Sequence, residues 1–191
     1  MKSNIKFKEL DLNVKGMGSP KVWGLINHLS GRGDVYLEVG VYQGASLIAA
    51  AQGNDTRCIG IDNFKQFNRD GDNEKICRKN ISPYKNIELI KGDGLKELRK
   101  LKTQKLKVDT FFYDGTHEKD AMTDAFKIAV PMINEGGYII IDDTNWKEIA
   151  NWIADFCEKS VWEVIFSRKA KFQGDAEGWW NGVQVLKRKG E

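Results

Sequence analysis

The sequence predicts an α/β fold in which a mostly parallel, seven-stranded sheet with an antiparallel last strand forms the middle layer of a three-layer sandwich. Three observations predict it. Short apolar segments of strand length alternate with segments of helical spacing along most of the chain. Gly or Asp residues follow the apolar segments, and strict alternation of strand and helix produces a parallel sheet covered by helices on both faces. The last two strand segments have no helix between them, which favours an antiparallel pair at one edge.

The first half of the chain contains three strand–helix units. The predicted strands are short apolar runs, the first ending at Gly40 and the second at Asp62: Val35–Val39, Thr56–Ile61 and Ile87–Lys91. The helices that follow them are an apolar stretch, a weaker stretch and a charged amphipathic one: Gly44–Gln52, Gly71–Asn80 and Leu95–Lys102. Ser19-Pro20 is a plausible start for an earlier helix, because Pro suits the first helical turn.

The second half contains two more units and the final strand pair. The strands Val108–Tyr113 and Tyr138–Ile141 end at Asp114 and Asp142. The intervening helix, Glu118–Ile133, has apolar residues at helical spacing, and Gly136-Gly137 is predicted to end it. A helix over Asn145–Glu158 precedes two last strands, Trp162–Phe166 and Val183–Leu186. The predicted plan is an N-terminal helical segment, residues 1–32, and one domain over residues 33–191.

Composition excludes several classes of protein. The chain has 191 residues, 30 Lys and Arg against 27 Asp and Glu, and a net charge of +3, which does not by itself indicate a nucleic-acid partner. Three scattered cysteines favour reduced thiols in the cytoplasm. The N-terminus has no apolar signal core and no apolar run is long enough to span a membrane. We therefore expect a cytoplasmic protein with neither a membrane nor a nucleic acid as partner.

A glycine-containing turn follows the first strand in the segment YLEVGVYQGASL. Gly40 permits a tight turn, and Gly44 permits close approach of the backbone to a ligand. Glu38 precedes Gly40 by two residues, where a carboxylate suits a positively charged ligand better than a pyrophosphate. Asp62 ends the second strand, where an acidic group accepts hydrogen bonds from ribose hydroxyls. Asp93, between two glycines after the third strand, is placed to accept a bond from an adenine amino group.

These segments resemble the first three motifs of class I S-adenosylmethionine (SAM) dependent methyltransferases, which have a Rossmann-like fold. The matching segments are ExGxxxG at Glu38–Gly44, IDNF at Ile61–Phe64 and GDG at Gly92–Gly94. The resemblance implies SAM as cofactor, with Phe64 covering the adenine. The implied cofactor contacts are Glu38, Gly40, Gly44, Asp62, Asn63, Phe64, Asp93 and Asp114. Tyr42 departs from the commonest form, in which a third glycine stands there. A nicotinamide-dependent Rossmann oxidoreductase is the alternative, but its G-x-G-x-x-G fingerprint is absent.

Acidic residues and a histidine follow the fourth and fifth strands, at the edge where ligands bind in open α/β sheets. The segments FFYDGTH and IIIDDTN resemble macrocin- and mycinamicin-type sugar O-methyltransferases and cephalosporin hydroxylase-like proteins. The resemblance implies Mg²⁺ binding by Asp114, Asp142 and Asp143, with His117 and Asp142 as catalytic residues and His117 as the base. Lys119 departs from the aromatic residue usual in those enzymes. As alternatives, Asp114 caps a helix, and Asp142 and Asp143 contact substrate or cap a helix without metal.

The expected partner is a small-molecule or sugar hydroxyl acceptor, with an RNA- or protein-directed methyltransferase as the alternative. Two parts of the chain are placed to contact the acceptor: Trp146 and the loop Ser167–Gly182. The loop contains basic residues as well as Trp179 and Trp180, and such side chains bind anions and stack on sugar rings. The other interpretation of this loop is a solvated segment anchored by its tryptophans. A homo-oligomer is left open. The sequence does not identify the acceptor.

Overall fold

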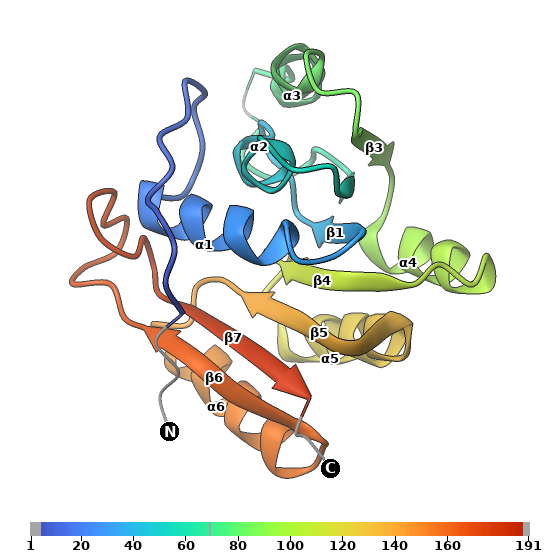
Figure 1. The fold of residues 1–191 in the computed structure, drawn as a ribbon, viewed down its shortest axis with the longest axis vertical. Coiled ribbons are helices and arrows are strands. Elements are labelled where there is room, and N and C mark those ends of the chain that lie inside the picture. Colours follow the sequence, from blue (N-terminus) through green and yellow to red (C-terminus); the bar gives the residue numbers. More distant parts are fainter. Residues whose placement is uncertain (1–4, 69, 189–191) are drawn as a thin grey trace.

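The computed structural model describes residues 5–68 and 70–188, and contains one seven-stranded sheet of order β3-β2-β1-β4-β5-β7-β6 (Figure 1). The strands are β1 (Val35–Val39), β2 (Arg57–Asp62), β3 (Ile87–Lys91), β4 (Val108–Tyr113), β5 (Ile133–Ile141), β6 (Trp162–Arg168) and β7 (Val183–Arg188). Strands β1 to β5 pair in parallel, whereas β7 is antiparallel to both β5 and β6. The predicted mostly parallel sheet with an antiparallel last strand is confirmed. The last strand lies inside the sheet, however, so β6 forms the edge.

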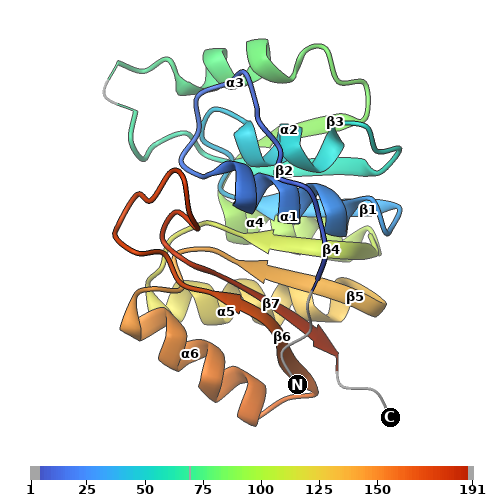
Figure 2. The same ribbon diagram turned by 60° about the vertical axis from the view of Figure 1, so that its left-hand side comes forward.

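Three helices cover each face of the sheet (Figure 2). One face carries α1 (Pro20–Ser30), α2 (Ala45–Ala51) and α3 (Asn73–Ile81), and the other carries α4 (Gly94–Thr103), α5 (Lys119–Ala129) and α6 (Lys147–Glu158). Neighbouring strand residues point to opposite faces: Tyr36 packs under α1 and α2, whereas Leu37 packs under α4 and α5. The three-layer sandwich expected from the sequence is therefore confirmed.

The end of α5 differs from the prediction. The helix stops at Ala129, and a single 3-10 turn, η1 (Val130–Met132), leads directly into β5. Pro131 lacks an N–H and cannot continue the helix. Gly136 and Gly137, predicted as a helix stop, lie instead within β5, where the pairing with β4 shifts register. A side chain at Gly137 would lie 2.7 Å from the Asp109 carbonyl oxygen, so glycine allows the irregular strand to approach β4.

The N-terminal segment is helical only over α1. The Ser19 hydroxyl accepts a 3.4 Å hydrogen bond from the Val22 amide and caps the helix, as the Ser-Pro pair predicted. Residues 5–19 form no helix; Phe7 within them packs on Trp179, with ring centroids 6.0 Å apart. The Ser19 hydroxyl also donates to the Gly178 carbonyl at 2.8 Å. Residues 1–4 and 189–191 of the predicted segments lie outside the described residues. No described helix is both long and apolar enough to cross a membrane.

Candidate active site

A cavity of about 1060 Å³ lies at the carboxyl ends of the five parallel strands β1 to β5. The parallel direction of these strands brings the loops that follow them to one edge of the sheet. Of the predicted cofactor residues, six line this cavity: Gly40, Asp62, Asn63, Phe64, Asp93 and Asp114. His117, Asp142 and Asp143 line it as well. The structure therefore places both predicted groups of residues around one space.

The turn after β1 depends on two glycines with positive φ. Gly40 has φ +94°, and a Cβ atom there would lie 2.0 Å from the Asp114 carbonyl oxygen. Gly44 has φ +93° and precedes α2, but the atoms nearest to it belong to Cys77 and Ile81 of α3. Gly44 does not line the cavity. Its observed role is to let α3 pack closely on the turn, and a cofactor contact at this residue stays a prediction.

Asp62 holds the turn in place from the neighbouring strand. One carboxylate oxygen accepts hydrogen bonds from the amides of Val41 and Tyr42 at 2.7 and 2.8 Å. The other oxygen accepts from the Phe64 amide at 2.6 Å. Tyr42, which replaces the usual middle glycine, has φ +52°, a conformation that costs energy for a side chain other than glycine. The carboxylate offsets this cost by pairing the amide of the strained residue.

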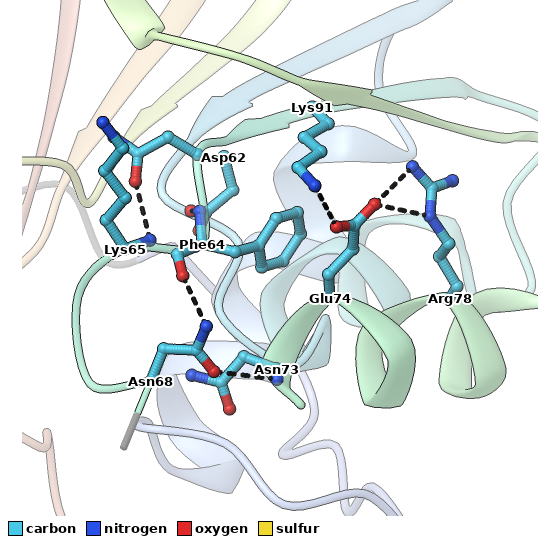
Figure 3. A network of polar contacts seen from close by, with 9 residues as sticks. Asp62, Phe64, Lys65, Asn68, Asn73, Glu74, Arg78 and Lys91 are labelled. Atoms are coloured by element: carbon cyan, nitrogen blue, oxygen red, sulfur yellow. Dashed lines mark hydrogen bonds and ion pairs between the residues drawn. The ribbon is translucent and has the colours of Figure 1, made fainter. Parts of the chain in front are cut away.

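The segment after β2 is folded against the start of α3 (Figure 3). Asn68 donates to the Phe64 carbonyl at 2.8 Å and accepts from the Asn73 amide at 3.1 Å. Phe64 has φ +56° and only 5% of its surface is exposed. Asn63 is exposed and accepts from the Lys65 amide at 2.8 Å. These bonds position Phe64 as a wall of the cavity.

Asp93 and Glu38 differ sharply in exposure. Asp93 is exposed, lines the cavity and caps α4 through a 3.0 Å bond from the Lys96 amide. Glu38 is completely buried behind the cavity and does not line it; the hydroxyls of Tyr36 and Ser46 donate to its oxygens at 2.6 and 3.0 Å. Burial raises the pKa of Glu38 to about 8. A direct contact of Glu38 with the cofactor stays a prediction.

Asp114, His117 and Asp143 form the acidic end of the cavity. Each offers one potential ligand atom, and these atoms lie within 4.8 Å of one another. His117 Nδ1 lies 3.5 Å from Asp143 Oδ2, while Nε2 is buried without a hydrogen-bond partner in the described structure. Asp143 has φ +56°, and its other oxygen accepts from the Asn181 amide group at 2.7 Å. This group contains Asp114 and Asp143 of the predicted metal set together with His117.

Asp142, which precedes Asp143 directly at the end of β5, is not part of this group. It is 2% exposed and lines the cavity, and its Oδ1 has no hydrogen-bond partner among the described residues. Burial, together with the charge of Asp143, raises the pKa of Asp142 well above its ordinary value. Burial also raises the pKa of Asp114, and the charges of Asp142 and Asp143 raise it further. Uncompensated negative charge here is costly, so the site favours a cationic ligand.

His117 is surrounded by aromatic rings. Its ring centroid lies 5.2 Å from that of Trp146 and 6.5 Å from that of Tyr113. Burial lowers the pKa of His117, and the charge of Asp143 opposes this shift. The imidazole is therefore neutral at pH 7 and able to accept a proton or bind a cation.

The loop between β6 and β7 contributes to the cavity less than predicted. Trp180, Asn181 and the segment Gln173–Gly174 line it, as does Trp146. Trp179 packs instead on Phe166, with ring centroids 5.5 Å apart, and acts as the anchor of the loop. Three further lining residues were not predicted individually: Asn181, which donates a hydrogen bond to Asp143, and Phe67 and Met17 at the rim. No local motif marks these residues, because they reach the cavity from separate segments.

A family model described as a methyltransferase domain matches residues 37–144, more than half of the chain. The chain belongs to this methyltransferase-domain family. The matched segment runs from β1 to the loop after β5, and so contains both the glycine turn and the group Asp114, His117 and Asp143. The predicted relationship to class I SAM-dependent methyltransferases is confirmed at the level of the family.

Solved structures of O-methyltransferases share the fold of this methyltransferase domain. The O-methyltransferase from Bacillus cereus in complex with SAH is 18% identical, with a TM-score of 0.64 over 88% of this chain and 79% of that protein. TomG from Streptomyces achromogenes, in complex with SAM and involved in tomaymycin synthesis, is 18% identical, with a TM-score of 0.65 over 94% of this chain and 83% of that protein.

One curated relative is similar in sequence. Uncharacterized protein R132 of Acanthamoeba polyphaga mimivirus is 29% identical in an alignment of 111 residues that covers 56% of this chain and 50% of that protein. The chain therefore spans about half the length of the curated relative that it matches.

Proposed function

We propose that this methyltransferase domain transfers the methyl group of SAM to a hydroxyl group of a small-molecule or sugar acceptor, with a divalent cation bound at the acidic end of the cavity. The observation that supports this most directly is the shared cavity. The ends of β1, β2 and β3, which carry the cofactor motifs, and the Asp114, His117 and Asp143 group open into the same space. Its volume, about 1060 Å³, is at the upper end of the usual range for ligand sites, about 300–1000 Å³.

The residues around the glycine turn fit SAM. Asp93 is an exposed carboxylate with one oxygen free of the helix cap, and Asn63 is an exposed amide that also lines the cavity. Phe64 and Leu95 add apolar wall. Methyl transfer is a direct displacement, so the protein needs no covalent nucleophile. It must instead hold the acceptor oxygen in line with the methyl group.

The acidic end fits a divalent cation. Asp114, His117 and Asp143 would hold it, and Asp142, whose buried Oδ1 has no hydrogen-bond partner among the described residues, lines the same cavity. Carboxylates suit Mg²⁺, whereas an imidazole nitrogen also suits Mn²⁺ and other transition metals. When bound, the cation supplies orientation of the acceptor hydroxyl and a lower pKa for it. Asp142 as a metal ligand stays a prediction.

His117 is the proposed base. Its neutral form at pH 7 and its partnerless Nε2 suit it to accept the hydroxyl proton. Asp143 Oδ2, 3.5 Å from Nδ1, would stabilise the imidazolium that forms. If Nε2 binds the cation instead, another group must take the proton. The metal titration below separates the two roles.

Calorimetric titration tests the proposal. We expect SAM and SAH to bind with micromolar affinity and NAD⁺ not to bind. Asp62→Asn should weaken SAM binding, whereas Asp55→Asn, an exposed site away from the cavity, should not. Binding of NAD⁺, or of neither nucleotide, would overturn the assignment.

Titration with Mg²⁺ and Mn²⁺ in the SAH complex tests the metal. Asp143→Asn and Asp114→Asn should each abolish the binding heat, with Asp120→Asn, an exposed acidic residue of α5 outside the cavity lining, as the control. Loss of binding in His117→Gln would assign the imidazole to the cation, and retained binding would assign it to the proton. Metal affinity unchanged by both aspartate variants would refute a metal at this site.

A further inference from the structure

The charge of the cavity lining is one-sided. Seven of the described lining residues are acidic, and none is Lys or Arg. The acidic residues are Asp62, Asp93, Asp114, Glu118, Asp142, Asp143 and Glu148. Since the whole chain has a net charge of +3, this segregation is not a consequence of composition. A cleft lined by one sign of charge concentrates ligands of the opposite sign and repels those of the same sign.

Two basic side chains near the cavity, those of Lys91 and Arg168, are directed to other partners. The Lys91 ammonium lies 2.6 Å from a Glu74 oxygen on α3 (Figure 3). The Arg168 guanidinium stacks on the Phe166 ring, 4.4 Å from its centroid. The Arg168 contact occupies one basic residue of the predicted loop Ser167–Gly182, and the exposed Lys169 and Lys171 of that loop are not part of the cavity lining.

Two of the seven carboxylates are not accounted for by the cofactor motifs or the metal group. Glu118 and Glu148 are exposed and line the cavity at the starts of α5 and α6. Neither side chain has a hydrogen bond or ion pair within the described structure. Glu118 follows His117 directly, and Glu148 lies two residues after Trp146. Both therefore flank the side of the cavity where an acceptor would reach the proposed base.

Part of the cavity rim is apolar. Phe67 is 70% exposed, Trp146 41% and Met17 37%, although large apolar side chains are usually covered. All three line the cavity, together with the partly buried Trp180. The Oδ1 atom of Asp142, a residue of the same lining, is buried and has no hydrogen-bond partner among the described residues. Exposed aromatic rings beside free carboxylates bind ring compounds and cations.

We propose that the acceptor is a ring compound that is uncharged or positively charged, and that Glu118 and Glu148 select against anionic acceptors. This proposal rests on the proposed methyl transfer and narrows its substrate class. A positively charged amine on the acceptor meets two carboxylates and an aromatic rim at the mouth. A carboxylate or phosphate at the same position meets no basic side chain among the described lining residues, and two like charges repel it.

Three matched phenols test the charge preference: tyramine, para-ethylphenol and para-hydroxyphenylpropionate, which are cationic, neutral and anionic. Their binding to the protein is measured by ligand-observed NMR, with and without saturating SAH and Mg²⁺. We expect tyramine to bind at least about tenfold more tightly than the anionic phenol, with ethylphenol between them, because each exposed carboxylate contributes a few-fold. The difference should shrink in high salt. Equal binding of all three, tighter binding of the anion, or no binding of any overturns the proposal.

Variants assign the preference to particular residues. In Glu118→Gln/Glu148→Gln the ratio of tyramine to anion affinity should fall about three- to tenfold, with ethylphenol affinity unchanged. Asp120→Asn removes the same charge from the first turn of α5 outside the cavity lining and should leave the ratio unchanged. An equal change of the affinity ratio in Asp120→Asn, or a double variant that changes only thermal stability, would show that the two glutamates stabilise their helices. Either result would refute their role in selecting the charge of the acceptor. Because the series without SAH needs no cofactor, failure of SAM binding would overturn the proposed function separately.

Discussion

Replacing Glu38 with Gln should stabilise the protein, and the gain should grow as the pH rises. The carboxyl group is completely buried between the hydroxyls of Tyr36 and Ser46. Its pKa is raised from 4.5 to about 8, first by burial and then by the charge of Asp62, while the two hydroxyls act in the opposite direction. Gln has nearly the same shape, pairs with both hydroxyls and carries no charge. The variant therefore removes the titration while preserving most of the packing.

The magnitude follows from linkage between proton binding and folding. Between pH 4.5 and about 8 the folded protein retains a proton on Glu38 that the unfolded chain releases, so stability falls as the pH rises. At about 1.4 kcal/mol per pKa unit, the cost is roughly 1 kcal/mol at pH 5 and roughly 4 kcal/mol at pH 8. Asp114 and Asp142 titrate in the same direction but are unchanged in the variant, so the difference between the two proteins isolates Glu38.

Urea unfolding from pH 5 to pH 8 measures this difference. The stability of Glu38→Gln relative to the wild type should increase by about 3 kcal/mol across this range. At pH 8 the midpoint of thermal unfolding should rise by about 8–16 °C, because roughly 4 kcal/mol corresponds to about 2–4 °C per kcal/mol for a chain of this size. Glu163→Gln, at an exposed residue of β6, is the matched control and should show no such trend. Parallel pH profiles for Glu38→Gln and the wild type would show that Glu38 is ionised in the folded protein and would refute this reasoning.

Three further predictions concern the cavity. His117→Gln should lower the rate at which SAH is formed with a hydroxyl acceptor by about 10²- to 10⁴-fold. The SAM affinity, measured by calorimetry, should stay unchanged. A rate of SAH formation near that of the wild type would contradict the role of His117 as base. Asp62→Ala should destabilise the protein by roughly 2–4 kcal/mol, because the backbone amides of Val41, Tyr42 and Phe64 lose a charged acceptor. Urea unfolding checks this value, and Asp55→Ala should have little effect. Trp180→Ala should weaken acceptor binding and leave the midpoint of thermal unfolding almost unchanged. Trp179→Ala should lower that midpoint, because the ring loses its packing on Phe7 and Phe166. Loss of stability in Trp180→Ala, together with loss of acceptor binding alone in Trp179→Ala, would contradict these roles.

Local sequence patterns predicted the sheet because most of its strands are buried and are therefore short apolar runs. Runs such as Val35–Val39 and Val108–Tyr113 are continuous apolar segments bounded by turn residues, and their ends were predicted to the residue. The end of α5 was predicted wrongly, because the apolar spacing continues past Pro131 into β5 and hides the change from helix to strand. The position of β7 inside the sheet depends on pairing between segments far apart in the sequence, which no local pattern contains.

The sequence predicted which residues lie at the strand ends, but not which atoms their side chains contact. Residues at strand ends had to lie near the cavity, and Asp62, Asp93 and Asp114 do. The sequence could not show that both carboxylate oxygens of Asp62 accept hydrogen bonds from backbone amides of the neighbouring turns, or that Glu38 lies behind the cavity. Both facts depend on side-chain direction, which strand periodicity sets only for a known register.

The pairing of β7 explains how a distant loop comes to control the acidic end of the cavity. Because β7 lies next to β5, the residues before it meet the residues that follow β5. The Asn145 amide donates to the Asn181 carbonyl at 2.8 Å, and the Thr144 amide donates to the Gly182 carbonyl at 3.2 Å. Gly182 has φ +89°, and a Cβ there would lie 2.4 Å from the Asn145 side chain. This close approach lets the Asn181 side chain reach Asp143, hold it in its left-handed conformation and direct its other oxygen toward His117. The geometry of the acidic group is thus set by the strand order of the sheet as much as by the residues that form it.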